Sequence, residues 1–128
     1  MTKDDHFPQF SCCTPILSVS NLLRSKDFYA KKLGFKIAFE WGTPVSYIGL
    51  TRGNVSIHLS DEKHSRHESG KSNITIISDE IDHYYQHCCE QGINIICEPG
   101  DRDYGMRDFG IEDIDGNILN FGCETGNH

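Results

Sequence analysis

The sequence predicts an α+β domain built from two copies of a strand–helix–strand–strand–strand (βαβββ) unit. Two observations predict it: the same order of elements occurs twice along the 128 residues, and a strong hairpin signal closes the second copy. The hairpin covers residues 103–122, with apolar strands on both sides of an Asp-Gly-Asn turn at residues 115–117. Glycine and asparagine tolerate the positive φ that such a turn needs.

The first copy begins with a strand over residues 14–20, where apolar and polar side chains alternate as in a half-buried strand. Residues 21–33 follow with apolar side chains at helical spacing. Asn21 or Ser25 is available as the helix N-cap, and Gly34 as the glycine that ends the helix. Three further strands are expected over residues 35–41, 45–51 and 55–60.

A polar loop over residues 61–71 separates the two copies, and the pattern then restarts with a strand over residues 72–78. The helix over residues 79–91 is expected to start at Asp79 as its N-cap and to stop at Gly92. Its core stripe is expected to contain Ile81, Tyr84, Tyr85 and Cys88, and the strand over 93–98 then leads to the closing hairpin.

The two copies, about residues 14–60 and 72–123, align without a gap at a constant offset from the first strand through the helix. The last strands of the two copies align at a slightly larger offset. The pairs include Ile16 with Ile74, Val19 with Ile77, Gly34 with Gly92, and His58 with Asn120. This alignment predicts that paired residues occupy the same face of their sheets.

The length of 128 residues predicts one domain over residues 14–128, preceded by an arm over residues 1–13. The N-terminus is charged, and no apolar run reaches the length of a signal peptide or a membrane span, so a cytoplasmic protein without a membrane partner is expected. A formal net charge of −7 argues against nucleic acid and suits a cationic ligand. Six cysteines without a CxxC motif make a zinc knuckle improbable.

Several segments carry a resemblance to the vicinal-oxygen-chelate superfamily, which includes glyoxalase I, extradiol dioxygenases, fosfomycin-resistance enzymes and bleomycin-resistance proteins. The segments are residues 15–21, Phe28-Tyr29, Leu33-Gly34-Phe35 and residues 114–121. Residues 39–41, 56–60 and 104–109 resemble the bleomycin-resistance branch more closely. Two positions depart from that branch: Ile114 replaces a proline, and Tyr104 stands where tryptophan is frequent.

The resemblance implies a fold in which the sheets form a cup and the helices lie outside, the glyoxalase/bleomycin-resistance fold. Strand alternation then assigns the side chains to two faces. Those expected to face the helices are Leu17, Val19, Val55, Ile57, Leu59, Leu119 and Phe121. Those expected to face the cup are Thr14, Ser18, Ser56, His58, Ser60 and Asn120.

The metal-dependent members hold their ion at four cup positions, which the resemblance maps onto Thr14, His58, Ser72 and Asn120. His58 is a good ligand for zinc, nickel, manganese or iron, but hydroxyl and amide groups are weak neutral donors. The sequence therefore predicts no metal cofactor and leans against an enzyme. If a metal were bound, His64 or His67 would have to join His58 as a second ligand. Their position in a polar loop, however, is more typical of solvent-exposed histidines.

The candidate ligand-binding residues combine aromatic rings, which stack on planar ligands, with a few polar groups. They are Trp41, Tyr47, His58, Ser60, Tyr104, Arg107, Phe109 and Asn120. Each of these residues has an alternative role. The aromatic residues would also fit the protein core or a dimer interface, and His58 could be a buried histidine whose hydrogen bonds are satisfied within the protein. Arg107 would bind an anion or pair with Asp103 or Asp108.

The resemblance implies a homodimer that sequesters a bleomycin-type antibiotic, with aromatic rings gripping its planar part and acidic surface attracting its cationic tail. The acidic residues expected at the mouth of the cup are Glu40, Asp61, Glu62 and Glu68. One alternative is a metal-dependent lyase, isomerase or dioxygenase of the same superfamily. Another is an interaction module whose pocket no longer binds a ligand.

Overall fold

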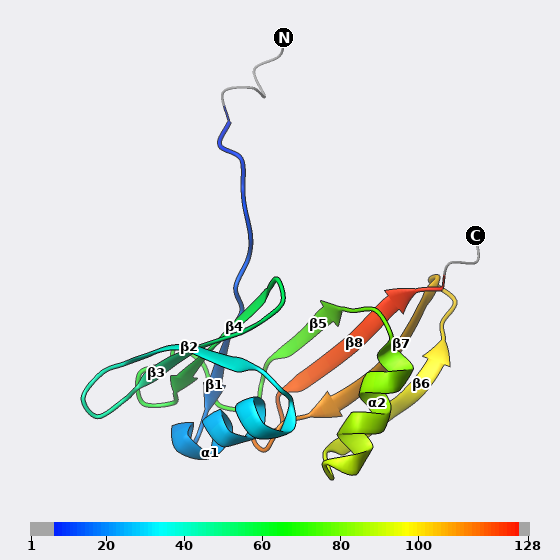
Figure 1. Ribbon diagram of the computed structural model, residues 1–128. Helices are drawn as coiled ribbons and strands as arrows, with labels where there is room; N and C mark the ends of the chain where they lie inside the picture. Colours follow the sequence, from blue (N-terminus) through cyan, green and yellow to red (C-terminus); the bar gives the residue numbers. More distant parts are fainter. Residues whose placement is uncertain (1–6, 126–128) are drawn as a thin grey trace.

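The computed structural model describes residues 7–125, which form two four-stranded sheets with a helical segment against each (Figure 1). The N-terminal half contains β1 (Ile16–Val19), α1 (Leu22–Asp27), the π-helical turn η2 (Phe28–Lys32), β2 (Lys36–Trp41), β3 (Tyr47–Arg52) and β4 (Val55–Asp61). The C-terminal half contains β5 (Asn73–Ile77), α2 (Ile81–Glu90), β6 (Asn94–Asp101), β7 (Met106–Glu112) and β8 (Ile118–Glu124). The two βαβββ units are thereby confirmed.

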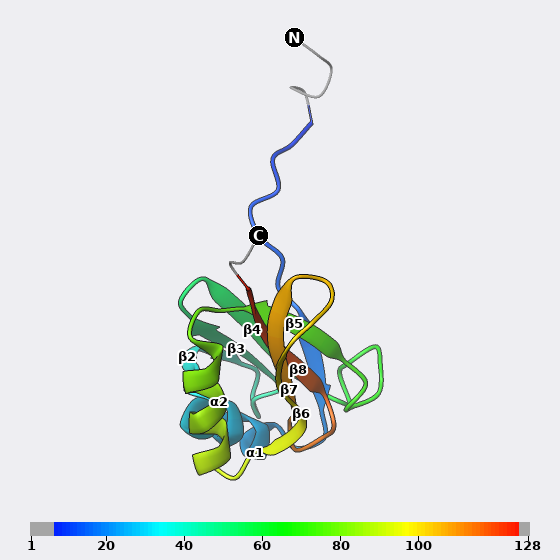
Figure 2. The same cartoon turned by 90° about the vertical axis from the view of Figure 1, so that its right-hand side faces the viewer.

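Both sheets have the same topology, with strand orders β1-β4-β3-β2 and β5-β8-β7-β6. In each sheet the first strand runs parallel to the last, and the other neighbours are antiparallel. Figure 2 shows α1 and α2 on the same side of the molecule. None of the helices within residues 7–125 is long and apolar enough to cross a membrane.

The core lies between the helices and the sheet faces that point toward them, as strand alternation predicts. Six of the seven side chains assigned to this face are buried: Leu17, Val19, Ile57, Leu59, Leu119 and Phe121. We call the opposite sheet face the cup face. Ser18 lies on the cup face but is fully buried, because Gly70 and Asn117 pack against it and donate hydrogen bonds to its carbonyl oxygen.

The gap-free alignment of the two copies is wrong at its first strand. Val19 is fully buried, whereas its expected counterpart Ile77 is 65% exposed on the cup face. The strand pairing gives the match instead: Leu17 pairs with Leu59 and Ile76 pairs with Phe121, so Ile76 is the buried equivalent of Leu17, and the buried equivalent of Leu22 is Ile81. From the first strand to the start of the helix, the two copies are therefore offset by one residue more than predicted, and Ile77 matches Ser18 on the cup face.

The π-helical turn η2 removes this difference, because a π-turn accommodates one more residue than an α-turn. The helical segment of the first copy is one residue longer between its first buried leucine and Gly34 than α2 is between Ile81 and Gly92. The two glycines have φ of +85° and +71° and end their helices as expected. The extra residue in η2 thus returns the offset between the two copies to its predicted value at the two glycines.

The helix starts differ between the two copies. Asn21 caps α1, since its side-chain oxygen accepts a hydrogen bond from the Arg24 amide at 3.1 Å, as predicted. The prediction that Asp79 caps α2 is wrong. Glu80 occupies that position with φ of +44°, and its side chain makes no capping hydrogen bond. The larger offset before the helix places Glu80, and not Asp79, at the position that Asn21 has in the first copy.

The turn between β7 and β8 does more than close a hairpin, because it joins the two halves. Asp113 and Asn117 are buried in this turn. Asp113 Oδ2 accepts a hydrogen bond from the Tyr29 hydroxyl at 2.7 Å, and Asn117 Nδ2 donates to the Ser18 carbonyl at 3.2 Å. Asn117 Oδ1 also accepts from the Ser72 amide at 3.0 Å. We call these residues the junction network.

Residues 7–13 of the expected arm are exposed, and Figure 1 shows them leading away from the sheets. Phe7 and Phe10 are 71% and 94% exposed. Residues 1–6 of the arm lie outside the described part of the chain.

Candidate functional site

Trp41, Tyr47 and His58 all lie on the cup face of the N-terminal sheet. Trp41 pairs with Tyr47 across β2 and β3, and His58 pairs with Gly49 across β4 and β3. Residues paired across neighbouring strands share a face, so the strands bring these three predicted residues together. Trp41 is the most open of the three, with 68% of its surface exposed.

Phe39 completes this surface and was not among the predicted residues. Its ring stacks on Tyr47 with centroids 6.3 Å apart, and its ring meets His58 edge to face at 5.3 Å. A register shift in β2 between Ile37 and Phe39 turns Ile37 to the core and Phe39 to the cup face. Strict alternation from Ile37 would have placed both residues on the same face.

Gly49 makes room for the Phe39 ring. A Cβ atom at Gly49 would lie 2.1 Å from Phe39 Cε2, so no other residue fits beneath the ring in its present position. A glycine inside a strand often marks the close approach of another group. The glycine at position 49, inside a predicted strand, was the feature of the sequence that would have indicated a bulky neighbour such as Phe39 on the adjacent strand. We call Phe39, Trp41, Tyr47 and His58 the aromatic platform.

His58 is held within the platform by Tyr47, whose hydroxyl lies 2.8 Å from His58 Nδ1. Burial raises the pKa of Tyr47, so the phenol keeps its proton. A phenol is a better donor than acceptor, and a neutral imidazole nitrogen is a good acceptor. We therefore assign the hydrogen bond as Tyr47 donating to Nδ1, which leaves the proton of His58 on Nε2 as a donor.

Ser60 also lies on the cup face of β4, but it is 3% exposed. Its hydroxyl donates to the Asp61 carbonyl at 3.3 Å. Ser60 is therefore not open to a ligand within this chain.

The cup face of the C-terminal sheet is more polar. Asn120 Nδ2 donates to Asn73 Oδ1 at 2.8 Å and to the Ile74 carbonyl at 3.0 Å. Asn73 is thus the cup-facing neighbour of Asn120 on β5. The assignment of Ser72 to this position was off by one residue, because the first strands of the two copies are offset by one residue more than predicted.

Tyr104 lies in the loop before β7 and is 68% exposed. Its hydroxyl donates to Asp108 Oδ2 at 2.6 Å, and Arg102 Nε donates to Asp108 Oδ1 at 2.7 Å. Partial burial of Asp108 raises the pKa of its carboxyl, but the bonds from Tyr104 and Arg102 outweigh burial and hold the pKa below its usual value. The ring of Tyr104 is therefore fixed at the edge of the C-terminal cup face.

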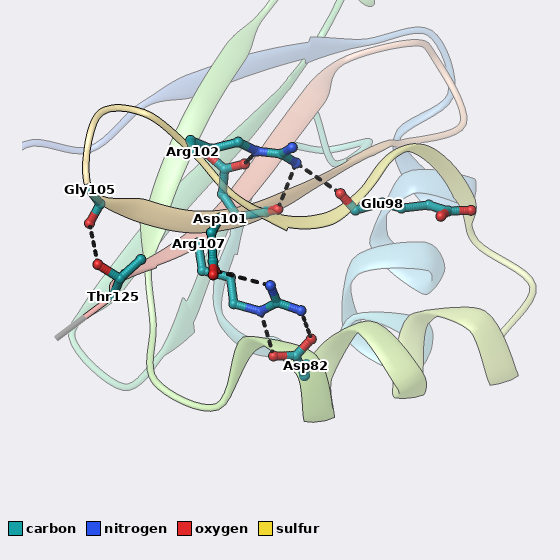
Figure 3. Close-up of polar contacts among 8 residues, drawn as sticks. Asp82, Glu98, Asp101, Arg102, Gly105, Arg107 and Thr125 are labelled. Atoms are coloured by element: carbon teal, nitrogen blue, oxygen red, sulfur yellow. Dashed lines mark hydrogen bonds and ion pairs between the residues drawn. The ribbon is translucent and has the colours of Figure 1, made fainter. Parts of the chain in front are cut away.

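Arg107 does not face the cup, which corrects its predicted role. Its Nε and Nη2 atoms each donate to the Asp82 carboxylate on α2 at 2.9 Å, and its Nη1 donates to Asp101 at 3.1 Å (Figure 3). The ion-pair alternative is correct, but with Asp82 and Asp101 rather than Asp103 or Asp108. Alternation along β7 turns Arg107 to the helix side, where two carboxylates already neutralise its charge.

Phe109 lies two residues further along β7 and faces the same way as Arg107. It is 1% exposed, and its ring stacks on Phe121 with centroids 5.4 Å apart. Its ring also meets Tyr85 of α2 edge to face at 5.4 Å. Phe109 is a core residue, so its predicted ligand contact is corrected as well.

Glu40 is not at the mouth of the cup. Its carboxylate pairs with Lys26 of α1 at 2.8 Å, which places Glu40 on the helix side of β2. Asp61 ends β4, where its side chain accepts a hydrogen bond from the Lys63 amide and contacts His64. The acidic surface near the cup is smaller than the sequence suggested.

The residues at the four family metal positions do not fit a divalent ion. Thr14, Asn73 and Asn120 offer neutral oxygen donors, and the Nδ1 atom of His58 is already bound by Tyr47. His64 Nδ1 contacts Asp61 Oδ1 at 3.2 Å instead of approaching His58. Within residues 7–125, no three His, Cys, Asp or Glu side chains converge on one point.

The cup faces expose large apolar side chains in both halves. Their exposed fractions are Ile16 47%, Phe39 43%, Trp41 68%, Ile77 65%, Ile96 44% and Tyr104 68%. Exposed apolar side chains gathered on one face favour a ligand site or a protein interface.

Comparison with known proteins agrees with this fold. The family model of the Glyoxalase/Bleomycin resistance protein/Dioxygenase superfamily matches residues 9–121, and the chain belongs to this superfamily. None of the curated protein sequences matches the chain significantly.

Solved structures similar to this chain include two antibiotic-binding proteins. TnmS3, an antibiotic binding protein from Streptomyces sp. CB03234, is 20% identical, with a TM-score of 0.81 over 93% of this chain and 100% of that chain. The bleomycin-binding protein of Streptomyces verticillus, in complex with copper(II)-bleomycin, is 19% identical, with a TM-score of 0.74 over 90% of this chain and 97% of that chain. A superfamily member from Sphaerobacter thermophilus is 21% identical, with a TM-score of 0.79 over 91% and 98% of the two chains. At these identities the likeness establishes the fold alone.

Proposed function

We propose that this chain binds and sequesters a planar, cationic small molecule of the bleomycin type, without a resident metal and without catalysis. The aromatic platform carries this proposal. The rings of Phe39, Tyr47 and His58 contact one another on one sheet face. Trp41 pairs with Tyr47 on the same face and is largely open. Aromatic rings in this arrangement offer flat area for stacking, and the Nε2 proton of His58 can bind an acceptor atom of the ligand.

We further propose that two copies of the chain pair through their cup faces to form a homodimer. The two halves offer different chemistry: aromatic rings on the N-terminal face, and Asn73, Asn120 and Tyr104 on the C-terminal face. A ligand would be enclosed if the C-terminal cup face of a second copy lay opposite the N-terminal cup face of the first. The formal net charge of −7 favours a cationic ligand at such a site.

The function is tested by calorimetry with chelator-treated protein, titrated with metal-free bleomycin and with its copper(II) complex. The chain has one tryptophan, Trp41, so quenching of its fluorescence reports directly on the platform. Binding by protein that holds no metal would support the proposal, and light scattering should give the mass of a dimer. One tightly bound Zn²⁺, Ni²⁺, Mn²⁺ or Fe²⁺ per chain would instead favour a metal-dependent enzyme.

Tyr104→Ala should raise the dissociation constant of the bleomycin-type ligand about tenfold, as expected for an aromatic side chain at a binding hot spot. Leu23→Ala is the matched control, because Leu23 is similarly exposed at 67% but lies on α1. Calorimetry measures both dissociation constants. An unchanged constant for Tyr104→Ala would refute the role of Tyr104, and equal losses in both variants would indicate a general effect.

Gly49→Ala should disturb the platform while the protein stays folded. The added methyl group displaces the Phe39 ring, which is free to swing outward because Phe39 is 43% exposed. We expect Trp41 fluorescence to change and ligand affinity to fall about fivefold, a loss typical of one stacking contact. The same substitution in a Phe39→Ala background should have little further effect, since the coupling between the two positions is then absent. Additive losses would show that Gly49 acts independently of Phe39.

A further inference from the structure

A cavity of about 570 Å³ lies between the two halves and is separate from the aromatic platform. The N-terminal half contributes Phe35 and the β3–β4 turn at residues 52–55, and the C-terminal half contributes residues 76–80, 83–84 and 121. Figure 1 shows β5 as the strand of the second sheet nearest the first half, so the cavity lies where the two units meet. Its volume is in the range of sites that hold small organic ligands.

The floor of the cavity is apolar and aromatic. Phe35, Ile76 and Phe121 are 5%, 9% and 4% exposed, and they belong to the helix side of the sheets. The Tyr84 ring meets Phe121 edge to face with centroids 4.9 Å apart. The Tyr84 hydroxyl donates to the Leu33 carbonyl at 2.7 Å, so this residue presents mainly its ring to the cavity. The floor suits one planar ring system.

The walls carry opposite charges from the two halves. Arg52 belongs to the N-terminal half, and Asp79 and Glu80 belong to the C-terminal half. Arg52 Nη1 donates to the Gly34 carbonyl at 3.0 Å, and no carboxylate among residues 7–125 forms an ion pair with it. The same holds for Asp79 and Glu80, whose side chains pair with no cation of the described chain. The charges therefore stay apart on either side of the cavity.

We propose that this cavity is a second small-molecule site and that it takes an aromatic zwitterion. The ring of the ligand would lie on the apolar floor, its carboxylate would meet the free guanidinium donors of Arg52, and its ammonium group would meet Asp79 and Glu80. Only a ligand with both charges satisfies both walls. Charge-assisted hydrogen bonds of this kind are stronger than neutral ones.

The test uses four compounds that share an indole ring but differ in charge: tryptophan, tryptamine, indole-3-propionate and indole. Each is titrated into ¹⁵N-labelled protein while amide chemical shifts are followed. We expect tryptophan to shift the amides of residues 53–55 and 78–84, and to bind about tenfold more tightly than either singly charged compound.

Two variants separate the charges. Arg52→Met should remove the advantage of tryptophan over tryptamine, and Asp79→Asn combined with Glu80→Gln should remove its advantage over indole-3-propionate. Arg24→Met is the matched control, because Arg24 is an exposed arginine of α1 and does not line the cavity. Unaltered tryptophan binding in the Arg52→Met protein would overturn the proposal.

The result does not depend on the function proposed for the cup faces. Tryptophan shifts confined to Phe39, Trp41 and Tyr47 would place the compound on the aromatic platform and would overturn the second site. No shifts at millimolar tryptophan would overturn it as well. Loss of bleomycin binding in the Tyr104→Ala protein would leave the cavity prediction untouched.

Discussion

Replacing Asp113 with alanine should lower the free energy of unfolding by about 4 kcal/mol, because it removes the centre of the junction network. The Asp113 carboxylate is 5% exposed. It accepts hydrogen bonds from the Tyr29 hydroxyl at 2.7 Å, from Asn117 Nδ2 at 2.9 Å, and from the backbone amides of Asp115 and Asn117 at 2.9 Å each. Alanine would leave the Tyr29 hydroxyl and the Asn117 amide buried without this acceptor.

Chemical denaturation of the parent and variant proteins measures the change. Tyr29→Phe removes one of the four hydrogen bonds and should lower stability by about 2 kcal/mol, the usual value for a bond to a charged group. Asp115→Ala is a nearby control, since its carboxylate accepts hydrogen bonds from the exposed Ser20 and only a long one, at 3.5 Å, from the buried Ser25, and should contribute less than about 1 kcal/mol. A loss below about 1 kcal/mol for Asp113→Ala would contradict the central role of this carboxylate.

The same network predicts a loss of stability at alkaline pH. Burial, and then the negative charge of Asp113, raise the pKa of Tyr29 well above its usual value of 10.0. A group with a raised pKa in the folded state contributes stability that is complete below its unfolded pKa and is lost as the pH rises above it. Stability should therefore fall as the pH rises above 10, and Tyr29→Phe should reduce that dependence.

The elements of the fold were predictable because their signals are local. Alternation marked the strands, apolar spacing marked the helices, and Gly34 and Gly92 marked where the helices end. The alignment of the two copies failed at the first strand because the extra residue in η2 changes the offset by one residue within the helix. A gap-free comparison applies the offset found after η2 to the strand before it, whereas the pairing of Leu17 with Leu59 and of Ile76 with Phe121 reveals the change.

The candidate site was predictable in part. Trp41, Tyr47 and His58 were found because aromatic and polar residues alternated visibly with the apolar core residues. Phe39 was missed because a register shift in β2 reverses the alternation, and such irregularities leave little trace in a single sequence. Phe109 was misplaced because its aromatic character was given more weight than its position on β7, next to Ile111 on the helix side.

The junction network was not predictable, because its members are distant in sequence. Tyr29 and Asp113 are 84 residues apart, and Ser18 and Asn117 are 99 residues apart. In the sequence Asp113 and Asn117 belong to an ordinary polar turn, and nothing local distinguishes a buried turn from an exposed one. The network matters for function because it joins the two halves that carry the proposed binding surfaces.

Gly70→Ala should lower the free energy of unfolding by about 3 kcal/mol, because the loop before β5 packs against the backbone of the same turn. A Cβ atom at Gly70 would lie 2.0 Å from the Asp115 carbonyl oxygen and 3.0 Å from the carbonyl carbon. Gly70 also has φ of +77°, which L-residues rarely adopt. The backbone on one side of the contact would have to move, and the two halves would shift relative to each other.

Gly92→Ala separates the two causes of this loss. Gly92 has a similar φ of +71°, but a Cβ atom there would meet nothing within 4 Å. This variant should therefore lose only the conformational term, about 1 kcal/mol, and chemical denaturation should show the excess in Gly70→Ala as the steric term. If the two variants lost equal stability, the loop and the turn would not be in tight contact. The position of the two binding surfaces would then depend on Asp113 and Asn117 alone rather than on the loop as well.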